Sequence, residues 1–166
     1  SGSHASTQLA VELLSDQLCV LTDQAVSSPR VADIGCGSGV LAVAAATLGA
    51  TCIATDIDPA AIDATTANAA TNGVAAAIEV RPGSTKEASG TYELVVVNVT
   101  IDVHEAIAAD FRRHLAAGPV IVAGLLAGPQ EQRAADAYNA KIVERRQQGE
   151  WVGLVLHLHD ATPSDR

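Results

Sequence analysis

Residues 31–39 constrain the fold more than any other segment, because a mostly apolar run leads directly into three closely spaced glycines. The segment reads Val-Ala-Asp-Ile-Gly-Cys-Gly-Ser-Gly, and an Ala-rich stretch follows it. A strand that turns sharply into a helix needs glycine, which adopts positive φ at little cost and lets a ligand approach the backbone closely. The helix N-terminus beyond the turn offers unpaired N–H groups to an anionic ligand group. The segment therefore predicts a parallel α/β fold with a ligand-binding loop.

The rest of the chain alternates short β-branched runs with Ala-rich helical stretches, which is typical of βαβ units. We predict strands over 30–34, 51–56, 77–81, 93–99 and 119–123. We predict helices before Ser27 and over 40–48, from Pro59 to Asn72, and over 102–115 and 129–139. On the helix over 102–115, we expect a stripe of Val103, Ile107, Phe111 and Leu115 to face the sheet.

The end of the chain changes pattern: residues 142–147 and 151–159 flank a Gly-containing turn and predict a hairpin. Five parallel strands closed by this antiparallel hairpin give a three-layer α/β fold. A length of 166 residues with 48% hydrophobic residues fits one domain. We divide it into an N-terminal loop and helix over 1–28, a βαβ core over 29–140 and the hairpin over 141–160.

Charge and composition exclude several classes of function. The chain has 10 Lys and Arg against 19 Asp and Glu, a net charge of -9, which disfavours direct nucleic-acid binding. The 3 cysteines form no CxxC pair and predict neither a disulfide framework nor a thiolate zinc site. No apolar run approaches the roughly 20 residues that span a bilayer. We expect a soluble, cytoplasmic protein that does not bind membranes.

The second predicted strand, 51–56, ends in a carboxylate at Asp56. In a parallel sheet this position lies beside the glycine loop, where a ribose diol would bind. One carboxylate can accept two hydroxyl hydrogen bonds, each of which contributes about 1.5–3 kcal/mol. We assign Asp58, which precedes Pro59, to capping the next helix.

The segment from Asp33 to Gly39, followed by Asp56, resembles the class I S-adenosylmethionine-dependent methyltransferases, whose Rossmann-like seven-stranded fold is similar to the predicted strand plan. The resemblance implies S-adenosylmethionine as cofactor and S-adenosylhomocysteine as product. It assigns to the methionine end Asp33 and the loop residues Gly35, Cys36, Gly37 and Gly39. It further assigns the ribose to Asp56, the adenine face to Ile57, and the polar adenine contact to Ser84 and Thr85 after the third strand.

Two further segments resemble the ribosomal protein L11 methyltransferases. The first, Ser1 to Thr7, is similar to the family's cofactor-closing loop Gly-Thr-Gly-x-His-Pro-Thr-Thr: Gly2, His4, Ser6 and Thr7 match, and Ala5 replaces Pro. This implies that His4 and Thr7 contact the cofactor. Because the chain lacks an initial Met and starts within this motif, we expect it to be the catalytic portion of a longer protein.

The second is Asn98 in Val-Asn-Val-Thr, which resembles the family's Asn-Ile-Leu motif beside the transferable methyl group. The resemblance implies methylation of lysine and N-terminal amines of a ribosomal protein, a basic partner that the net charge allows. The Asn98 carbonyl can accept a hydrogen bond from an amine and aim its lone pair. His104 is the best candidate for handling a proton nearby. His157 and His159 lack a third ligand, so we predict no metal site.

Other functions remain open on these residues. A small-molecule N- or O-methyltransferase has the same loop, as does a non-catalytic cofactor-binding module. A nicotinamide-dependent oxidoreductase shares the glycines and the ribose acid, but an acid two residues before Gly35 argues against it. Glutamine- and adenine-directed methyltransferases normally carry Asn-Pro-Pro-Tyr where this chain has Asn-Val-Thr-Ile from Asn98. The chain lacks both prolines and the aromatic ring, which disfavours these two classes.

Overall fold

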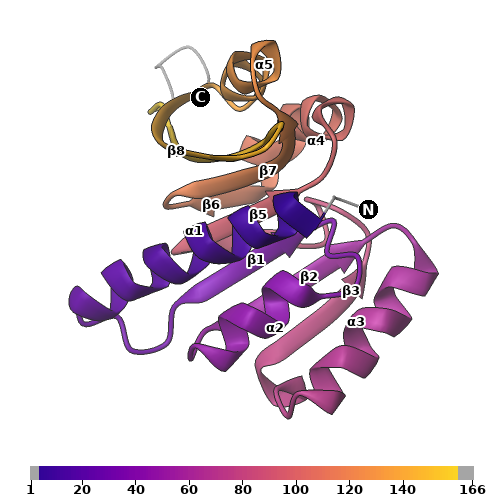
Figure 1. Ribbon diagram of the computed structural model, residues 1–166. Coiled ribbons are helices and arrows are strands. Elements are labelled where there is room, and N and C mark those ends of the chain that lie inside the picture. Colours follow the sequence, from indigo (N-terminus) through magenta and orange to yellow (C-terminus); the bar gives the residue numbers. More distant parts are fainter. Residues whose placement is uncertain (1–3, 161–166) are drawn as a thin grey trace.

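The computed structural model describes residues 4–160 and arranges them in three layers, with helices on both faces of a central sheet (Figure 1). The helices are α1 (His4–Asp23), α2 (Val40–Thr47), α3 (Pro59–Thr71), η1 (Ala75–Ala77), α4 (Ile101–His114) and α5 (Pro129–Ala137). The strands are β1 (Arg30–Ile34), β2 (Thr51–Asp56), β3 (Ile78–Pro82), β4 (Gly90–Tyr92), β5 (Leu94–Asn98), β6 (Leu115–Ala117), β7 (Val120–Leu126), β8 (Ala140–Gln148) and β9 (Trp151–Leu158).

The main sheet has seven strands in the order β3-β2-β1-β5-β7-β9-β8, which confirms the predicted fold class. Strands β3, β2, β1, β5 and β7 are parallel, and β9 and β8 are antiparallel. The strand order reverses between β1 and β5. In open α/β sheets, ligands bind beyond the carboxyl ends of the strands at such a switch point.

Two short strands were not expected from the sequence. Strands β4 and β6 pair with each other in a separate two-stranded sheet. Each has three residues, which is too short for a period-2 hydrophobic pattern to distinguish a strand from a turn. The predicted bounds of β1 and β2 agree with the structure, whereas β7 runs to Leu126 rather than ending at Ala123.

The predicted buried stripe of α4 is confirmed in part. Phe111 and Leu115 are buried and Ile107 packs partly buried against the core, whereas Val103 is 43% exposed. The other buried residues of α4 are Ile101, His104 and Ala108. The pattern missed His104 because it does not count a histidine as a core residue. The sequence pattern therefore missed the most informative buried side chain of α4.

One hydrophobic core lies on each face of the sheet. The α1, α2 and α3 side includes Leu13, Leu14 and Leu41, and the α4 and α5 side includes Phe111 and Tyr138. No helix among residues 4–160 combines the length and apolarity needed to cross a membrane.

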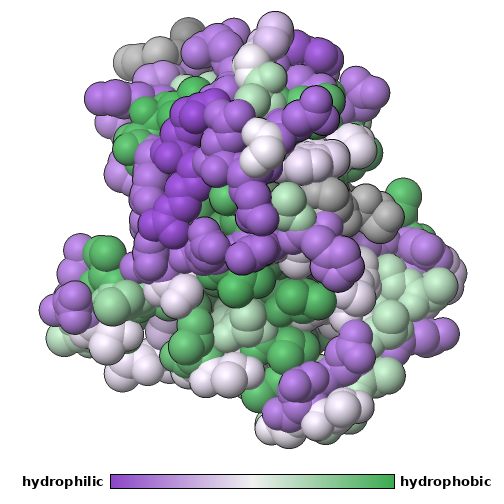
Figure 2. Space-filling view, viewed as in Figure 1, coloured by the Kyte–Doolittle hydropathy of each residue, from purple (hydrophilic) through white to green (hydrophobic). Residues whose placement is uncertain are grey.

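Strand β8 is a sheet edge, and Figure 2 shows hydrophilic side chains gathered over it. Arg145 pairs with Glu131 of α5 at 2.6 Å, and Arg146 pairs with Asp16 of α1. Charged side chains of this kind protect an edge strand from pairing with another chain.

Candidate functional site

The predicted site residues lie on three neighbouring strands at the switch point. Ile34, the last residue of β1, pairs in register with Thr55 of β2 on one side and Val97 of β5 on the other. The glycine loop, Asp56 and Asn98 each follow these register positions by one or a few residues. Because all three strands are parallel, these groups meet at one edge of the sheet.

The glycine loop adopts the sharp turn that its sequence predicts. Gly35 and Gly39 have φ values of 74° and 83°, in the left-handed region. A Cβ atom at Gly35 would lie 2.8 Å from Val99 Cγ1, and one at Gly39 would lie 2.7 Å from Thr65 Cγ2. Both positions therefore require glycine for conformation and for space.

Helix α3 holds the glycine loop from one side. Thr65 Oγ1 donates to the Gly37 carbonyl at 2.9 Å, and Asn68 Nδ2 donates to the Ser38 carbonyl at 2.7 Å. Sequence reasoning missed Thr65 and Asn68, because their partners are about 30 residues away and the only local signal is that both lie on one face of α3. Cys36 is buried in this loop, and burial raises the pKa of its thiol to about 12. The thiol is thus a packing group.

Asp33 is the most unusual polar group near the site. It is 1% exposed, and neither carboxylate oxygen has a hydrogen-bond partner among the described residues. Burial raises its pKa to about 7, and the charge of Asp56 adds to the rise, while the nearby Ala42 backbone N–H lowers it in part. A buried carboxylate without partners is costly. The fold therefore keeps a destabilising acid in β1, two residues before Gly35.

Asp56 ties the loop to the end of β2. One of its carboxylate oxygens accepts a hydrogen bond from the Gly37 N–H at 2.9 Å, and the other accepts one from the Asp58 N–H at 2.9 Å. Each carboxylate oxygen retains a further lone pair. Asp58 accepts from the Ala60 N–H and caps α3, as predicted. The neighbouring Ile57 side chain is 83% exposed and is a free apolar surface beside this carboxylate.

The loop after β3 contains an acid that the sequence analysis overlooked. Glu87 accepts a hydrogen bond from the Ser84 N–H at 2.8 Å, which lowers the pKa of the Glu87 carboxyl. The spacing Ser-x-x-Glu from Ser84 is that of a capping box and could have indicated this contact. Thr85 is 4% exposed, so the expectation that its side chain meets a ligand is not supported. Ser84 and Glu87 are both partly accessible.

Asn98 is held by the first turn of α1. Ser6 Oγ donates to Asn98 Oδ1 at 2.7 Å, and Asn98 Nδ2 donates to Thr7 Oγ1 at 3.3 Å. Thr7 thus lies beside the predicted site residue Asn98, and so does Ser6, which is fully buried. His4 is exposed at the first residue of α1, so His4 to Thr7 form a helical turn where a loop was expected. Gly2 of the same motif lies outside the described residues.

His104 does not face an acceptor, which corrects the sequence analysis. Its side chain is 0% exposed, with Nδ1 2.8 Å from the Tyr138 hydroxyl and Nε2 2.8 Å from the Ala123 carbonyl. Burial lowers its pKa to about 4, so the imidazole is neutral near pH 7. Both ring nitrogens are engaged inside the fold, and proton transfer with a substrate is not supported.

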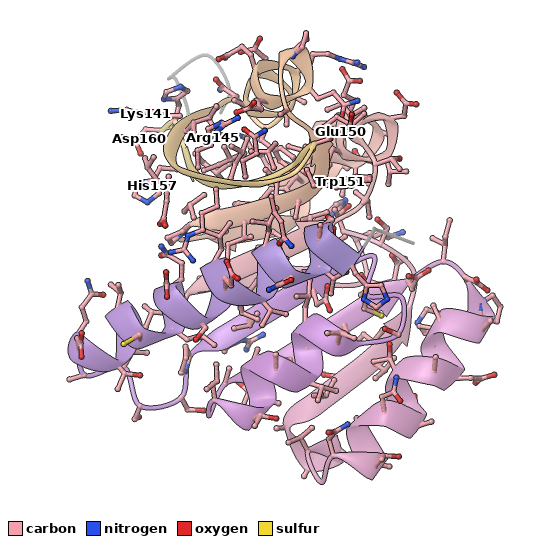
Figure 3. The ribbon with its side chains drawn as sticks, in the orientation of Figure 1. Lys141, Arg145, Glu150, Trp151, His157 and Asp160 are labelled. Carbon is pink, nitrogen blue, oxygen red and sulfur yellow. The ribbon has the colours of Figure 1, made fainter. Side chains whose placement is uncertain are left out.

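The hairpin histidines lie on a different part of the surface. Lys141 of β8 pairs in register with His157 of β9, and Figure 3 shows both, with Asp160, at the opposite end of the hairpin from Trp151. Within residues 4–160, no group of three or more His, Cys, Asp and Glu side chains is placed to hold a metal ion.

Comparison with known proteins decides the family. The family model of the ribosomal protein L11 methyltransferase (PrmA) matches residues 1–159. This chain belongs to that family. A ribosomal protein L11 methyltransferase from Pelotomaculum thermopropionicum is 39% identical over 166 residues, which cover 95% of this chain and 51% of that protein. The chain therefore spans about half the length of this L11 methyltransferase.

Solved structures agree with the L11 methyltransferase fold. The crystal structure of the ribosomal protein L11 methylase from Lactobacillus delbrueckii subsp. bulgaricus has a TM-score of 0.79 and 30% identity, and covers 95% of this chain and 81% of that one. An RNA methyltransferase from Salinibacter ruber, solved in complex with S-adenosyl-L-homocysteine, has a TM-score of 0.64 and 18% identity, and covers 92% of this chain and 94% of that one. The second match supports the fold alone.

Proposed function

We propose that this chain binds S-adenosylmethionine and transfers its methyl group to an amine of a ribosomal protein, at a lysine or an N-terminal amine. Family membership supports the reaction class. The observation that carries the proposal is the site at the switch point, where a glycine loop with a buried acid beneath it lies beside Asp56 and Asn98. The product would be S-adenosylhomocysteine.

The residues of the first two strands fit this cofactor. Asp33 is a buried carboxyl whose oxygens have no hydrogen-bond partner among the described residues, and its pKa is raised to about 7. A cationic ammonium group bound at the loop would favour its charged form. Asp56 has free lone pairs for a ribose diol, and Ile57 offers an exposed apolar side chain to an aromatic base. Ser84 and Glu87 provide polar groups at the neighbouring loop.

Asn98 would orient the acceptor amine. When bound, S-adenosylmethionine supplies an electrophilic methyl group on a sulfonium, so the task of the protein is to aim the nitrogen lone pair. The Asn98 carbonyl oxygen accepts from Ser6 and keeps a second lone pair for an amine N–H. An amide cannot act as a base, and His104 is buried. The amine must therefore arrive neutral, and its proton leaves to solvent after transfer.

The net charge supports a basic acceptor, and the cysteines support a reducing compartment. A net charge of -9 favours a basic partner over a polyanion. Cys19, Cys36 and Cys52 are free thiols, which fits a reducing cytoplasm.

The test is calorimetry with S-adenosylmethionine combined with mass spectrometry of purified ribosomal protein L11 incubated with both. We expect Asp56→Ala to weaken cofactor binding at least about tenfold, because two diol hydrogen bonds are lost. Asp63→Ala removes an exposed acid of α3 and is the matched control. The proposal fails if the wild type gives no binding heat. Binding without methylation of L11 would instead favour a small-molecule acceptor or a non-catalytic module.

A further inference from the structure

We propose that His104 is a positioning residue that fixes the backbone segment carrying Asn98. It acts from inside the fold, through the Ala123 carbonyl and not through a substrate. The part of this inference that concerns reaction rate rests on the proposed function. The part that concerns the orientation of Asn98 does not, and it can be tested without an acceptor.

The hydrogen bonds of His104 determine its tautomer. A backbone carbonyl can only accept, so the 2.8 Å contact between Nε2 and the Ala123 oxygen places the proton of the neutral ring on Nε2. Nδ1 is then an acceptor, and the Tyr138 hydroxyl donates to it at 2.8 Å. The Tyr138 ring also packs edge-on against His104, with ring centroids 5.7 Å apart. Both nitrogens are satisfied in a single ring orientation.

The Ala123 carbonyl lies directly beside Asn98. In the pairing of β5 with β7, Ala123 is the register partner of Asn98. Next along β7, Gly124 has a φ of 83°, and a Cβ atom there would lie 2.2 Å from the Val99 carbonyl oxygen. The register of β7 with β9 also shifts at this point, between Val122 and Leu125. Strand β7 therefore bends around the residue that follows Asn98.

His104 joins this bend to the two helices that pack beside it. Its ring bonds the Ala123 carbonyl at the bend and, through the Tyr138 hydroxyl, reaches the end of α5. The backbone N–H of His104 donates to the Thr100 carbonyl at 3.0 Å, where α4 begins, two residues after Asn98. His104 thus links the bend in β7 to the end of α5 and to the start of α4.

A buried position of α4 that served packing alone would need only an apolar side chain. The other buried residues of α4, Ile101, Ala108 and Phe111, are apolar. A buried polar ring is stable only when both nitrogens are bonded, and such networks specify one arrangement of the groups they join. The network here holds the Ala123 carbonyl, and Ala123 is the register partner of Asn98. On the opposite side, Ser6 and Thr7 fix the Asn98 side chain.

The experiment compares Tyr138→Phe with a matched control, Tyr92→Phe. Both tyrosines are buried, and both donate one hydroxyl hydrogen bond, Tyr138 to His104 and Tyr92 to the Ala88 carbonyl. Tyr92 lies beside Arg30, the first residue of β1, far from the carboxyl ends of the strands. Each variant is measured for its melting temperature, for the NMR signals of the Asn98 side-chain amide, and for the KM and kcat of methylation of ribosomal protein L11.

We expect both variants to lose a similar few degrees of melting temperature. Only Tyr138→Phe should shift the Asn98 amide signals and lower kcat about tenfold, with cofactor Kd and KM within twofold, because a small misplacement of a reacting group slows transfer. His104→Gln retains an N–H donor and should restore part of the kcat that His104→Leu loses.

The proposal is overturned if Tyr138→Phe leaves the Asn98 signals unchanged, or if Tyr92→Phe changes them equally. If the wild type methylates nothing, the proposed function fails, and the NMR comparison still decides whether His104 positions Asn98.

Discussion

The two halves of the site are built in opposite ways. Around the glycine loop, Asp33 is buried without a partner among the described residues, and its pKa is raised to about 7. Around Asn98, the amide is bonded to Ser6 and Thr7, and both nitrogens of the nearby His104 are bonded. We propose that a cationic ligand group compensates the charge of Asp33 in the first half. The second half is ordered before any ligand arrives, as positioning an acceptor requires.

The pH dependence of stability should separate the two halves. The raised pKa of Asp33 means that the folded state holds an extra proton between about pH 4 and 7, so its contribution to stability falls as pH rises through this window. The lowered pKa of His104, about 4, means that the unfolded state holds the extra proton between about pH 4 and 6.5, so its contribution rises with pH. The two effects oppose each other in the wild type.

The largest expected effect is therefore a change in the pH dependence of stability on Asp33→Asn substitution. The variant keeps the His104 contribution alone, and its stability should rise with pH between 4 and 6.5, whereas the wild type changes little. At about 1.4 kcal/mol per pKa unit, the difference between the two proteins should grow by roughly 2–4 kcal/mol between pH 4 and 7.5. Urea unfolding at several pH values measures it. Parallel curves would mean that Asp33 is not the destabilising group that its burial indicates.

The second-largest effect is expected at Asn98, in the half of the site that is already ordered. Asn98→Ala removes the carbonyl that we propose aims the amine, and turnover should fall about 100-fold while cofactor affinity changes less than threefold. Single-turnover kinetics with purified ribosomal protein L11, together with cofactor calorimetry, separates the two quantities. A variant with unchanged turnover would remove Asn98 from the mechanism, and an equal loss of affinity would place it in the cofactor half.

The smallest effect is expected at Thr65, which supports the glycine loop. Thr65→Val keeps the shape of the side chain but removes the hydroxyl that donates to the Gly37 carbonyl at 2.9 Å. The loss of one partly buried hydrogen bond should cost about 1 kcal/mol of stability. Cofactor affinity should fall a few-fold, since the loop loses an anchor. Thr66→Val, on the exposed face of α3, is the control and should be nearly neutral in both measurements.

Local sequence patterns predicted one half of the site better than the other. The bounds of β1 and β2, the loop glycines and the Asp58 cap follow from contiguous residues, so periodicity and turn chemistry were sufficient. His104 was misplaced because its burial depends on Tyr138 and Ala123, which lie far along the chain. Thr65 and Ser6 were missed as support residues for the same reason. The resemblance to the L11 methyltransferases pointed to Asn98, but its tertiary partners required the structure.

Hydrogen–deuterium exchange with and without S-adenosylmethionine tests the contrast between the two halves most directly. We expect slower exchange with the cofactor in peptides covering residues 35–39 and Asp56 to Asp58, because a bound ligand would reduce the local opening of a loop whose amides are already hydrogen-bonded. Peptides covering residues 5–10 and 98–101 should change less. Unchanged exchange everywhere, or slower exchange confined to the peptides around Asn98, would contradict the proposed contrast.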